Sequence, residues 1–259
     1  MERTNVITGA ASGIGKATKE LLESRGEKVI GVDLHDADVT VDLTTPEGRS
    51  QMAGRVAELS GGTVDAVFAV AGLSGAVPAT VGVNFFGMVA TLEGLRPFLG
   101  SSAAPRAVAV ASMASLLPVD EELVAAMARG DEHAALVRAE VLAKDPQTGG
   151  LIYSSSKKAL AQWIRRQAPS ADWAGASIPL NAVAPGIIAT PMTADLIATE
   201  EARAAILQMV PMPLNGIAQP IVVARLLAWL GSEENTHLCG QVVFVDGGSD
   251  AVIRGDSTW

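Results

Sequence analysis

A glycine-rich turn near the start of the chain constrains the fold more than any other feature of the sequence. The turn lies between an apolar strand containing Val6 and Ile7 and a helix expected to reach about Arg25. Residues 28–33 then predict a second strand, which closes a βαβ unit. Glycines here let the backbone approach a pyrophosphate, and the helix N-terminus offers amide donors. A structural turn could use the same residues, but the strand and helix context favours a dinucleotide site formed by Gly9, Ser12, Gly13, Ile14 and Gly15.

The rest of the chain continues to alternate apolar strands with helices. Further strands are expected at 64–70, 108–111, 180–183 and 242–245, and helices from about Pro46 and over 80–99, 153–168 and 219–230. Because a crossover helix separates each strand from the next, the strands should run parallel. The sequence therefore predicts an α/β fold in which residues 1–259 form a single doubly wound Rossmann domain with about seven parallel strands.

One charged, alanine-rich segment interrupts this alternation. Residues 120–144 have a helical period and contain Gly130, which suggests two short helices split at that glycine. We expect a helical insertion over about 116–150, before the helix that starts at Tyr153. Its acidic residues should face solvent, whereas the following apolar residues should pack inward near the substrate mouth: Leu116, Leu117, Val124, Met127, Leu136 and Val137.

Charge and composition argue against several classes of partner. The chain has 19 basic and 28 acidic residues, and a net charge of -9 repels nucleic acid and anionic membranes. Cys239 is the single cysteine, and with three scattered histidines it gives no metal-ligand spacing. The uncharged stretch 66–92 is interrupted by glycines and Pro78, and no signal peptide is recognisable. We expect a cytoplasmic protein with no metal, nucleic-acid or membrane partner.

Asp33 ends the second predicted strand, roughly 20 residues after the glycines, where a carboxylate can bind the adenosine ribose. A carboxylate would repel the 2′-phosphate of NADP, and the neutral Ser12 offers that phosphate no cation. Asp33 therefore predicts NAD as the cofactor. A solvated carboxylate at a strand end is the alternative.

Four further polar residues are candidates for chemistry. Tyr153 and Lys157 lie four residues apart, so they share one helix face, and a nearby ammonium would favour the phenolate of a tyrosine acid/base. An ordinary helix surface has the same spacing. Ser112 follows the fourth apolar strand and could hold a substrate oxygen, although Ser115 could do so instead. Asn84 interrupts an apolar helix and needs either a water or lysine partner, or a local one.

Taken together, the glycine-rich turn, Asn84, Ser112, Tyr153 and Lys157 occur in an order that resembles the classical short-chain dehydrogenase/reductase family over essentially the whole chain. The resemblance implies that Ser112 orients the substrate oxygen and that Tyr153 exchanges its proton. It implies that Lys157 also binds the nicotinamide ribose and that Asn84 anchors a water in the proton relay.

The same resemblance implies further contacts with NAD. Asp42 and Leu43 would lie at the adenine side, and Pro185, Gly186, Ile188 and Thr190 beside the nicotinamide. The family's usual Asn-Asn-Ala-Gly reads Ala-Val-Ala-Gly over 69–72, so contacts from both asparagines are missing. Ala71 and Gly72 are still expected to line the cofactor site.

The insertion separates this chain from most of the family, because 40 residues lie between Ser112 and Tyr153. The insertion and the ending 245–254 resemble the bacterial 3α-hydroxysteroid dehydrogenase/carbonyl reductase branch. This resemblance implies an enzyme that interconverts a secondary alcohol and a ketone, with a 3α-hydroxysteroid or other cyclic carbonyl compound as the small-molecule substrate. A terpene alcohol or dihydrodiol dehydrogenase, or an NAD-binding regulator without turnover, is the alternative.

The insertion also bears on assembly. Family tetramers usually form a four-helix interface that includes the helix starting at Tyr153, and the insertion should cover part of it. We therefore expect a homodimer rather than the usual tetramer, joined through 219–230 and 242–245. Its expected contacts, which could instead belong to the core, are Leu226, Leu227, Trp229 and Leu230.

Overall fold

The computed structural model describes residues 3–257. Its centre is a sheet of seven strands, all parallel, in the order β3-β2-β1-β4-β5-β6-β7. The predicted α/β class and the expected seven parallel strands are confirmed. The strands are β1 (Thr4–Thr8), β2 (Lys28–Asp33), β3 (Val39–Thr40), β4 (Ala66–Ala69), β5 (Arg106–Val110), β6 (Leu180–Pro185) and β7 (Val242–Val245).

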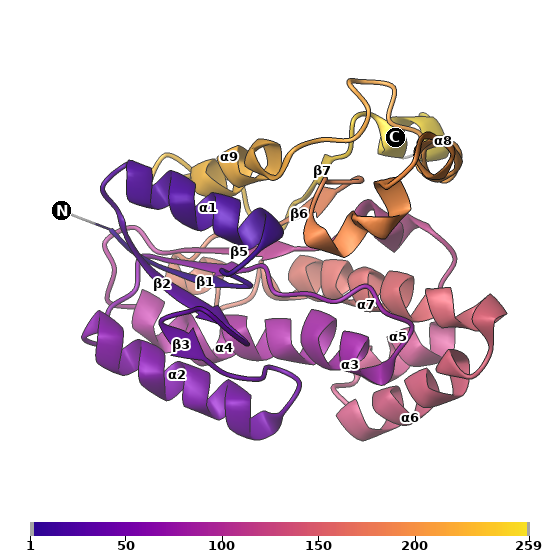
Figure 1. Cartoon of the computed structure of the whole chain (residues 1–259). Helices are drawn as coiled ribbons and strands as arrows, with labels where there is room; N and C mark the ends of the chain where they lie inside the picture. Colours follow the sequence, from indigo (N-terminus) through magenta and orange to yellow (C-terminus); the bar gives the residue numbers. More distant parts are fainter. Residues whose placement is uncertain (1–2, 258–259) are drawn as a thin grey trace.

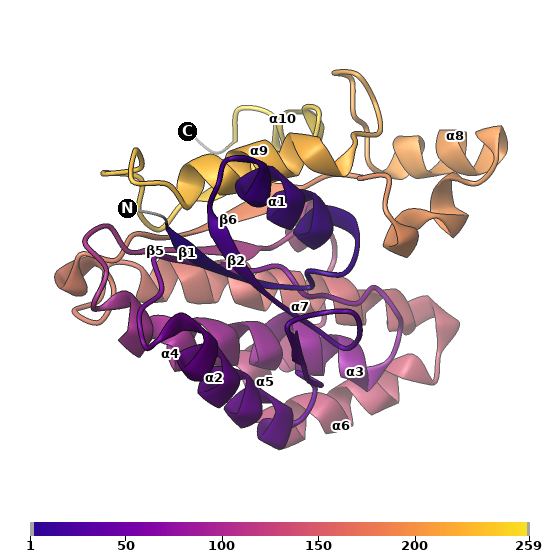
Figure 2. The same cartoon turned by 60° about the vertical axis from the view of Figure 1, so that its left-hand side comes forward.

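Helices cover both faces of the sheet, as Figures 1 and 2 show. On one face α1 (Gly13–Ser24) packs against α9 (Pro220–Leu230). On the other lie α2 (Pro46–Ser60), α4 (Met88–Leu99) and α7 (Pro146–Gln167). Strands β4 and β5 are buried along their whole length, as strands between two helical layers must be. The strand order reverses beside β1, which has β2 on one side and β4 on the other, and this is where such sheets bind ligands.

The insertion forms two helices, as predicted, α5 (Glu121–Ala128) and α6 (Glu132–Ala143), separated at Gly130 with φ 71°. Both pack against α7, and α6 also contacts α3 (Pro78–Val81). Val124 and Met127 are buried as expected, but Val137 is 46% exposed, so its predicted inward position is wrong. The reason is that α6 buries a stripe at Ala135, Ala139 and Leu142, and Val137 lies off that stripe.

Two predicted helices differ in their bounds. The region 80–99 is not a uniform α-helix, because a π-helical stretch (Gly82–Gly87) lies between α3 and α4. Helix α7 begins at Pro146 rather than Tyr153, because Asp145 caps it by accepting from the amide of Gln147 at 2.9 Å. Gly149 is part of this helix, where an added Cβ would lie 2.9 Å from the Cβ of Ala76.

The remaining elements are short and lie mostly after β6. They are the 3-10 turns Met113–Leu116, Ala174–Ala176, Pro191–Thr193 and Asp195–Ile197, and the helices α8 (Glu200–Met209) and α10 (Ser249–Arg254). Within residues 3–257 no helix has both the length and the apolar character needed to cross a membrane.

Candidate functional site

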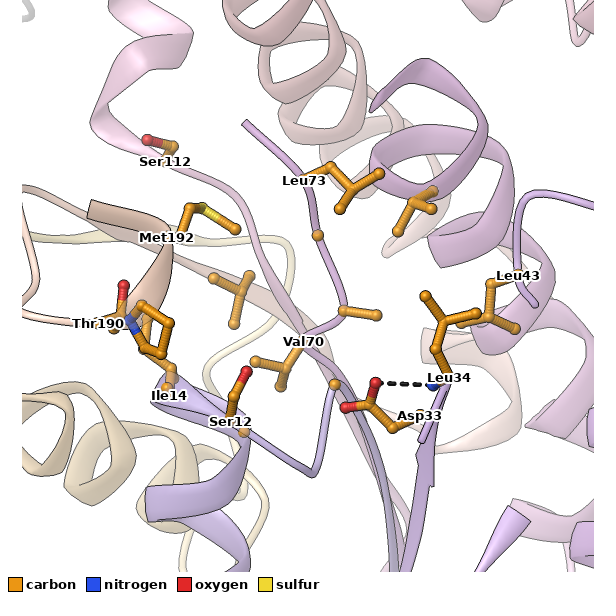
Figure 3. A pocket seen from close by; sticks show the side chains of 18 of the residues that line it. Ser12, Ile14, Asp33, Leu34, Leu43, Val70, Leu73, Ser112, Thr190 and Met192 are labelled. Carbon is orange, nitrogen blue, oxygen red and sulfur yellow. Dashed lines mark hydrogen bonds between the residues drawn. The ribbon is translucent and has the colours of Figure 1, made fainter. Parts of the chain in front are cut away.

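A cavity of about 580 Å³ opens at the carboxyl edge of the sheet, where the strand order reverses. Figure 3 shows Ser112 and Met192 toward one end of it and Asp33, Leu34 and Leu43 toward the other. Every residue predicted to bind the cofactor lines this cavity, and so does Ser112. Its volume lies within the range of cofactor sites. Of the predicted site residues, only Asn84 is not part of its wall.

The glycine-rich turn forms the floor of the cavity through very close backbone packing. A Cβ on Gly15 would lie 2.0 Å from the carbonyl oxygen of Gly9, and Gly9 itself has φ 72°. A Cβ on Gly9 would lie 2.9 Å from both Cα and N of Ala71, beyond the end of β4. A side chain is therefore excluded at Gly9 and at Gly15, which leaves the N-terminus of α1 open to an anionic group.

Asp33 is held at the end of β2 with both carboxylate oxygens oriented by the backbone. One oxygen accepts from the amide of Ala11 at 2.9 Å, and the other accepts from the amide of Leu34 at 2.7 Å. The second contact is the dashed line in Figure 3. The carboxylate therefore links the glycine-rich turn to β2 while it lines the cavity.

The segment that follows β3 forms the wall beside Asp33. Asp42 Oδ1 accepts from the amide of Thr44 at 2.8 Å and from its hydroxyl at 2.7 Å, while Leu43 is buried. An added Cβ on Gly48 would lie 2.0 Å from the carbonyl oxygen of Asp42, so the chain turns sharply into α2 here. This wall is built by local hydrogen bonds and tight backbone contact.

Ser112, Tyr153 and Lys157 meet at the opposite end of the cavity. Ser112 follows β5 and caps a 3-10 turn, its Oγ accepting from the amide of Ala114 at 3.1 Å. Burial raises the pKa of Tyr153, and a hydrogen bond with Ser112 acts in the opposite direction. Ser115 is buried too, but it does not line this cavity.

Lys157 is 3% exposed, and its Nζ donates to the carbonyl oxygen of Val110 at 2.8 Å. Burial lowers the pKa of Lys157 to about 7. Its Nζ lies 5.8 Å from the ring centroid of Tyr153. Burial outweighs the hydrogen bond with Ser112 in its effect on the pKa of Tyr153, and it also weakens the charge of Lys157. The expectation that Lys157, together with a positive nicotinamide ring, favours the phenolate stays a prediction.

Asn84 is fully buried in the π-helical stretch and its amide is satisfied locally. Its Oδ1 accepts from the amide of Leu73 at 2.8 Å, and its Nδ2 donates to the carbonyl of Leu73 at 2.9 Å and to Ser156 Oγ at 3.1 Å. Of the two alternatives left open by the sequence, these contacts match the local one. The implied role of Asn84 as a water anchor stays a prediction.

The cavity also has wall residues that sequence reasoning missed. Thr193 is one for which a signal existed, because Thr190 and Thr193 have the spacing of a capping box. Thr193 Oγ1 accepts from the amide of Thr190 at 3.1 Å and shapes the turn after β6. The apolar members are buried or half-exposed through tertiary packing and gave no such signal. Missed wall residues include Leu34, Val41, Thr44, Leu73, Met192 and Thr193.

Within residues 3–257 no three His, Cys, Asp or Glu side chains gather as they would around a metal ion.

Comparison with known proteins gives a consistent result. A family model described as enoyl-(acyl carrier protein) reductase matches residues 9–250. A 3-alpha-hydroxysteroid dehydrogenase/carbonyl reductase of Comamonas testosteroni is 36% identical over 257 residues, covering 96% of this chain and 97% of the relative. A cis-4-hydroxycyclohexanecarboxylate dehydrogenase of Sinomonas cyclohexanicum is 31% identical, with 97% and 98% covered.

Among solved structures, a 3-alpha-hydroxysteroid dehydrogenase from Pseudomonas sp. B-0831, crystallised with NADH, superposes with a TM-score of 0.87. It is 38% identical, and the match covers 98% of this chain and 99% of that one.

Proposed function

The chain belongs to the short-chain dehydrogenase/reductase family, as its motifs predicted, and on that premise we propose that it is an NAD-dependent oxidoreductase interconverting a secondary alcohol and a ketone. One observation carries the proposal. A single cavity joins the glycine-rich turn and Asp33 at one end to Ser112, Tyr153 and Lys157 at the other. A dinucleotide site and an acid/base site therefore share one space.

The residues present fit a dinucleotide. The turn from Gly9 to Gly15, which has no side chain at its three glycines, would hold the pyrophosphate at the N-terminus of α1, and Asp33 would bind the adenosine ribose. Pro185, Gly186, Ile188 and Thr190 would flank the nicotinamide. When bound, this cofactor supplies a hydride acceptor for alcohol oxidation or a hydride donor for carbonyl reduction. The relative crystallised with NADH supports this choice of cofactor.

Tyr153 would move the proton that balances this hydride. In reduction its phenol donates a proton to the carbonyl oxygen, and in oxidation it accepts the proton of the alcohol. The hydroxyl of Ser112 lines the same end of the cavity as the phenol of Tyr153, so both groups can hold one substrate oxygen. The pKa of Lys157, about 7, lets its amine gain or lose a proton at neutral pH.

Asn84 would act on this site from behind its wall. A Cβ added to Gly72 would lie 3.2 Å from Asn84 Oδ1 and 3.7 Å from Lys157 Nζ. The side-chain amide of Asn84 thus fixes the backbone of Leu73, the residue that follows Gly72. We assign Asn84 a positioning role, and the water that the family resemblance implies would add to it.

The substrate we propose is a 3α-hydroxysteroid or another cyclic alcohol or ketone. Apolar side chains at the cavity, among them Leu73, Val83 and Met192, suit a hydrocarbon ring system. The two relatives named for cyclic substrates support this class.

The test is a screen of purified protein with NAD and with NADP against 3α-hydroxysteroids, alicyclic alcohols, terpene alcohols and dihydrodiols, following the absorbance of NADH or NADPH. We expect turnover with NAD on a cyclic alcohol, and none for Tyr153→Phe with the same compound. If only a terpene alcohol or a dihydrodiol is turned over, the proposed substrate class is wrong and that compound class replaces it. Tight NADH binding with no turnover across the panel would favour the regulator.

We further propose that residues 1–259 act as one domain and assemble as a homodimer in the cytoplasm. Helices α5 and α6 pack on α7, where they would cover part of the usual tetramer interface. Leu227 and Leu230 are fully buried in the core, so the prediction that they are dimer contacts is wrong. Trp229 is 41% exposed on α9 and stays a candidate contact.

A further inference from the structure

Arg49 connects three parts of the chain that are distant in sequence. It belongs to α2, and its side chain is only 10% exposed. Its Nε donates to the carbonyl of Leu43 at 2.8 Å, and its Nη2 donates to the carbonyls of Thr44 at 3.1 Å and Gly82 at 3.3 Å. Both terminal nitrogens also donate to the carboxylate of Glu132, at 2.8 and 2.7 Å. Arg49 therefore bonds to four residues through one planar group.

The two ends of this set of bonds have different roles. Leu43 and Thr44 line the cofactor cavity next to Asp33, the end where the adenosine would lie. Glu132 is the first residue of α6, so it belongs to the insertion. The bidentate pair with Glu132 fixes the plane of the guanidinium, and that plane points its remaining N–H groups at the backbone of the wall.

We infer that Arg49 and Glu132 are positioning residues through which the insertion braces the adenine-side wall of the cofactor cavity. The inference rests on the proposed binding of NAD. Loss of the Glu132 carboxylate frees the guanidinium to rotate, and the carbonyls of Leu43 and Thr44 lose a fixed donor. The wall then spends less time in the conformation that accepts the adenosine. Arg49 and Glu132 have no hydrogen bond with Ser112 or Tyr153, which lie at the far end of the cavity.

The test uses two conservative variants and one matched control. Glu132→Gln keeps the shape of the side chain but removes its charge, and Arg49→Lys keeps the charge but removes the fork. Glu121→Gln is the control, because Glu121 is the corresponding first residue of α5 and lies outside this set of bonds. The control therefore removes an acidic residue from the first turn of an insertion helix without touching Arg49.

Affinity for NADH is measured by fluorescence, and AMP and nicotinamide mononucleotide are titrated as competitors for the two halves of the site. We expect Glu132→Gln to weaken the affinity for NADH and for AMP by about three- to tenfold, because one charge-assisted pair is lost. Affinity for nicotinamide mononucleotide should change by less than about twofold, and kcat at saturating NAD should stay near that of the wild type. Arg49→Lys should weaken AMP at least as much, and Glu121→Gln should match the wild type.

Each other outcome counts against the inference. Equal AMP affinity in Glu132→Gln and Glu121→Gln would overturn it, even if Arg49→Lys failed to fold. A similar loss of affinity for AMP and for nicotinamide mononucleotide would also overturn it, because a general destabilisation of the protein weakens binding of both halves of the cofactor. If the wild type binds NADH tightly and the variants bind NADH and AMP with the same affinity, this inference is wrong but the proposed function stands. A wild type that fails to bind NADH defeats the proposed function and this inference with it.

Discussion

Replacing Lys157 with methionine should make the cofactor-free protein more stable at neutral and acidic pH, although it removes a proposed catalytic group. Lys157 is 3% exposed, and its Nζ has one hydrogen bond within the described chain, to the carbonyl of Val110. Burial lowers the pKa of Lys157 from 10.5 to about 7. Below about pH 7 the ammonium is present in both the folded and unfolded states, so the folded protein bears the whole cost of burying it.

The size of the effect follows from this displacement of the pKa. It corresponds to about 5 kcal/mol near pH 6, about 3 kcal/mol near pH 8.5 and less than about 1 kcal/mol near pH 10. The cost falls as pH rises because the folded protein is already neutral at this site while the unfolded chain still binds the proton. The methionine variant also lacks the hydrogen bond to the carbonyl of Val110, which costs it about 1 kcal/mol of stability at every pH. The variant should therefore gain most at pH 6 and nothing near pH 10.

The assay is urea unfolding of both proteins without cofactor, at one protein concentration and at pH 6, 8.5 and 10. Lys158→Met serves as the control, because Lys158 is the next residue of α7 and is only partly buried. Its difference from the wild type should not change across this range. A Lys157→Met advantage that is independent of pH, or that grows with pH, would refute the reasoning.

Three substitutions and one measurement on the wild type test the site and the assembly. Tyr153→Phe should lose turnover but keep NADH affinity, because only the exchangeable proton is lost; turnover within about tenfold of the wild type would remove Tyr153 as the acid/base. The wild type should prefer NAD over NADP by at least about tenfold in kcat/KM, and Asp33→Asn should reduce this ratio when both cofactors are measured. An unchanged ratio would contradict the proposed role of the carboxylate. Gly15→Ala should abolish NADH binding, because its Cβ would lie 2.0 Å from the carbonyl oxygen of Gly9, whereas Gly54→Ala, with nothing within 4 Å, should bind normally in the same titration. Light scattering should give a dimer, and a tetramer would contradict the blocking role of the insertion.

The features that the sequence predicted well depend on local spacing. Tyr153 and Lys157 share a helix face because four residues make about one turn, and Asp33 reaches the cavity because it ends a strand beside the glycine-rich turn. Both relations hold in any parallel sheet with this order of elements. The order of motifs along the chain was therefore enough to predict the fold and to predict which residues line one cavity.

Where the sequence failed, tertiary contacts decided the outcome. The predicted helix began at Tyr153, but α7 begins at Pro146 and contains Gly149, which allows the helix to pack closely against Ala76. The apolar residues of α9 could have faced a partner or the core, and packing on the sheet buries Leu227. Periodicity cannot separate such cases, because it identifies a helix face without identifying what covers that face.

The three serines between Tyr153 and Lys157 lie within the motif but have hydrogen-bond partners that are distant in sequence. Ser154 Oγ donates to the carbonyl of Pro118 at 2.6 Å, and Ser155 Oγ accepts from the amide of Asp120 at 2.9 Å. Pro118 follows the 3-10 turn that Ser112 caps, so these bonds fix the loop of Ser112 against the helix of Tyr153. Three adjacent serines on a helix give no sequence signal for partners more than 30 residues away. The first residues of the insertion therefore contact the helix of the proposed catalytic Tyr153 directly. We expect Asp120→Ala to lower kcat more than it lowers NADH affinity, and steady-state kinetics with an NADH titration would check this.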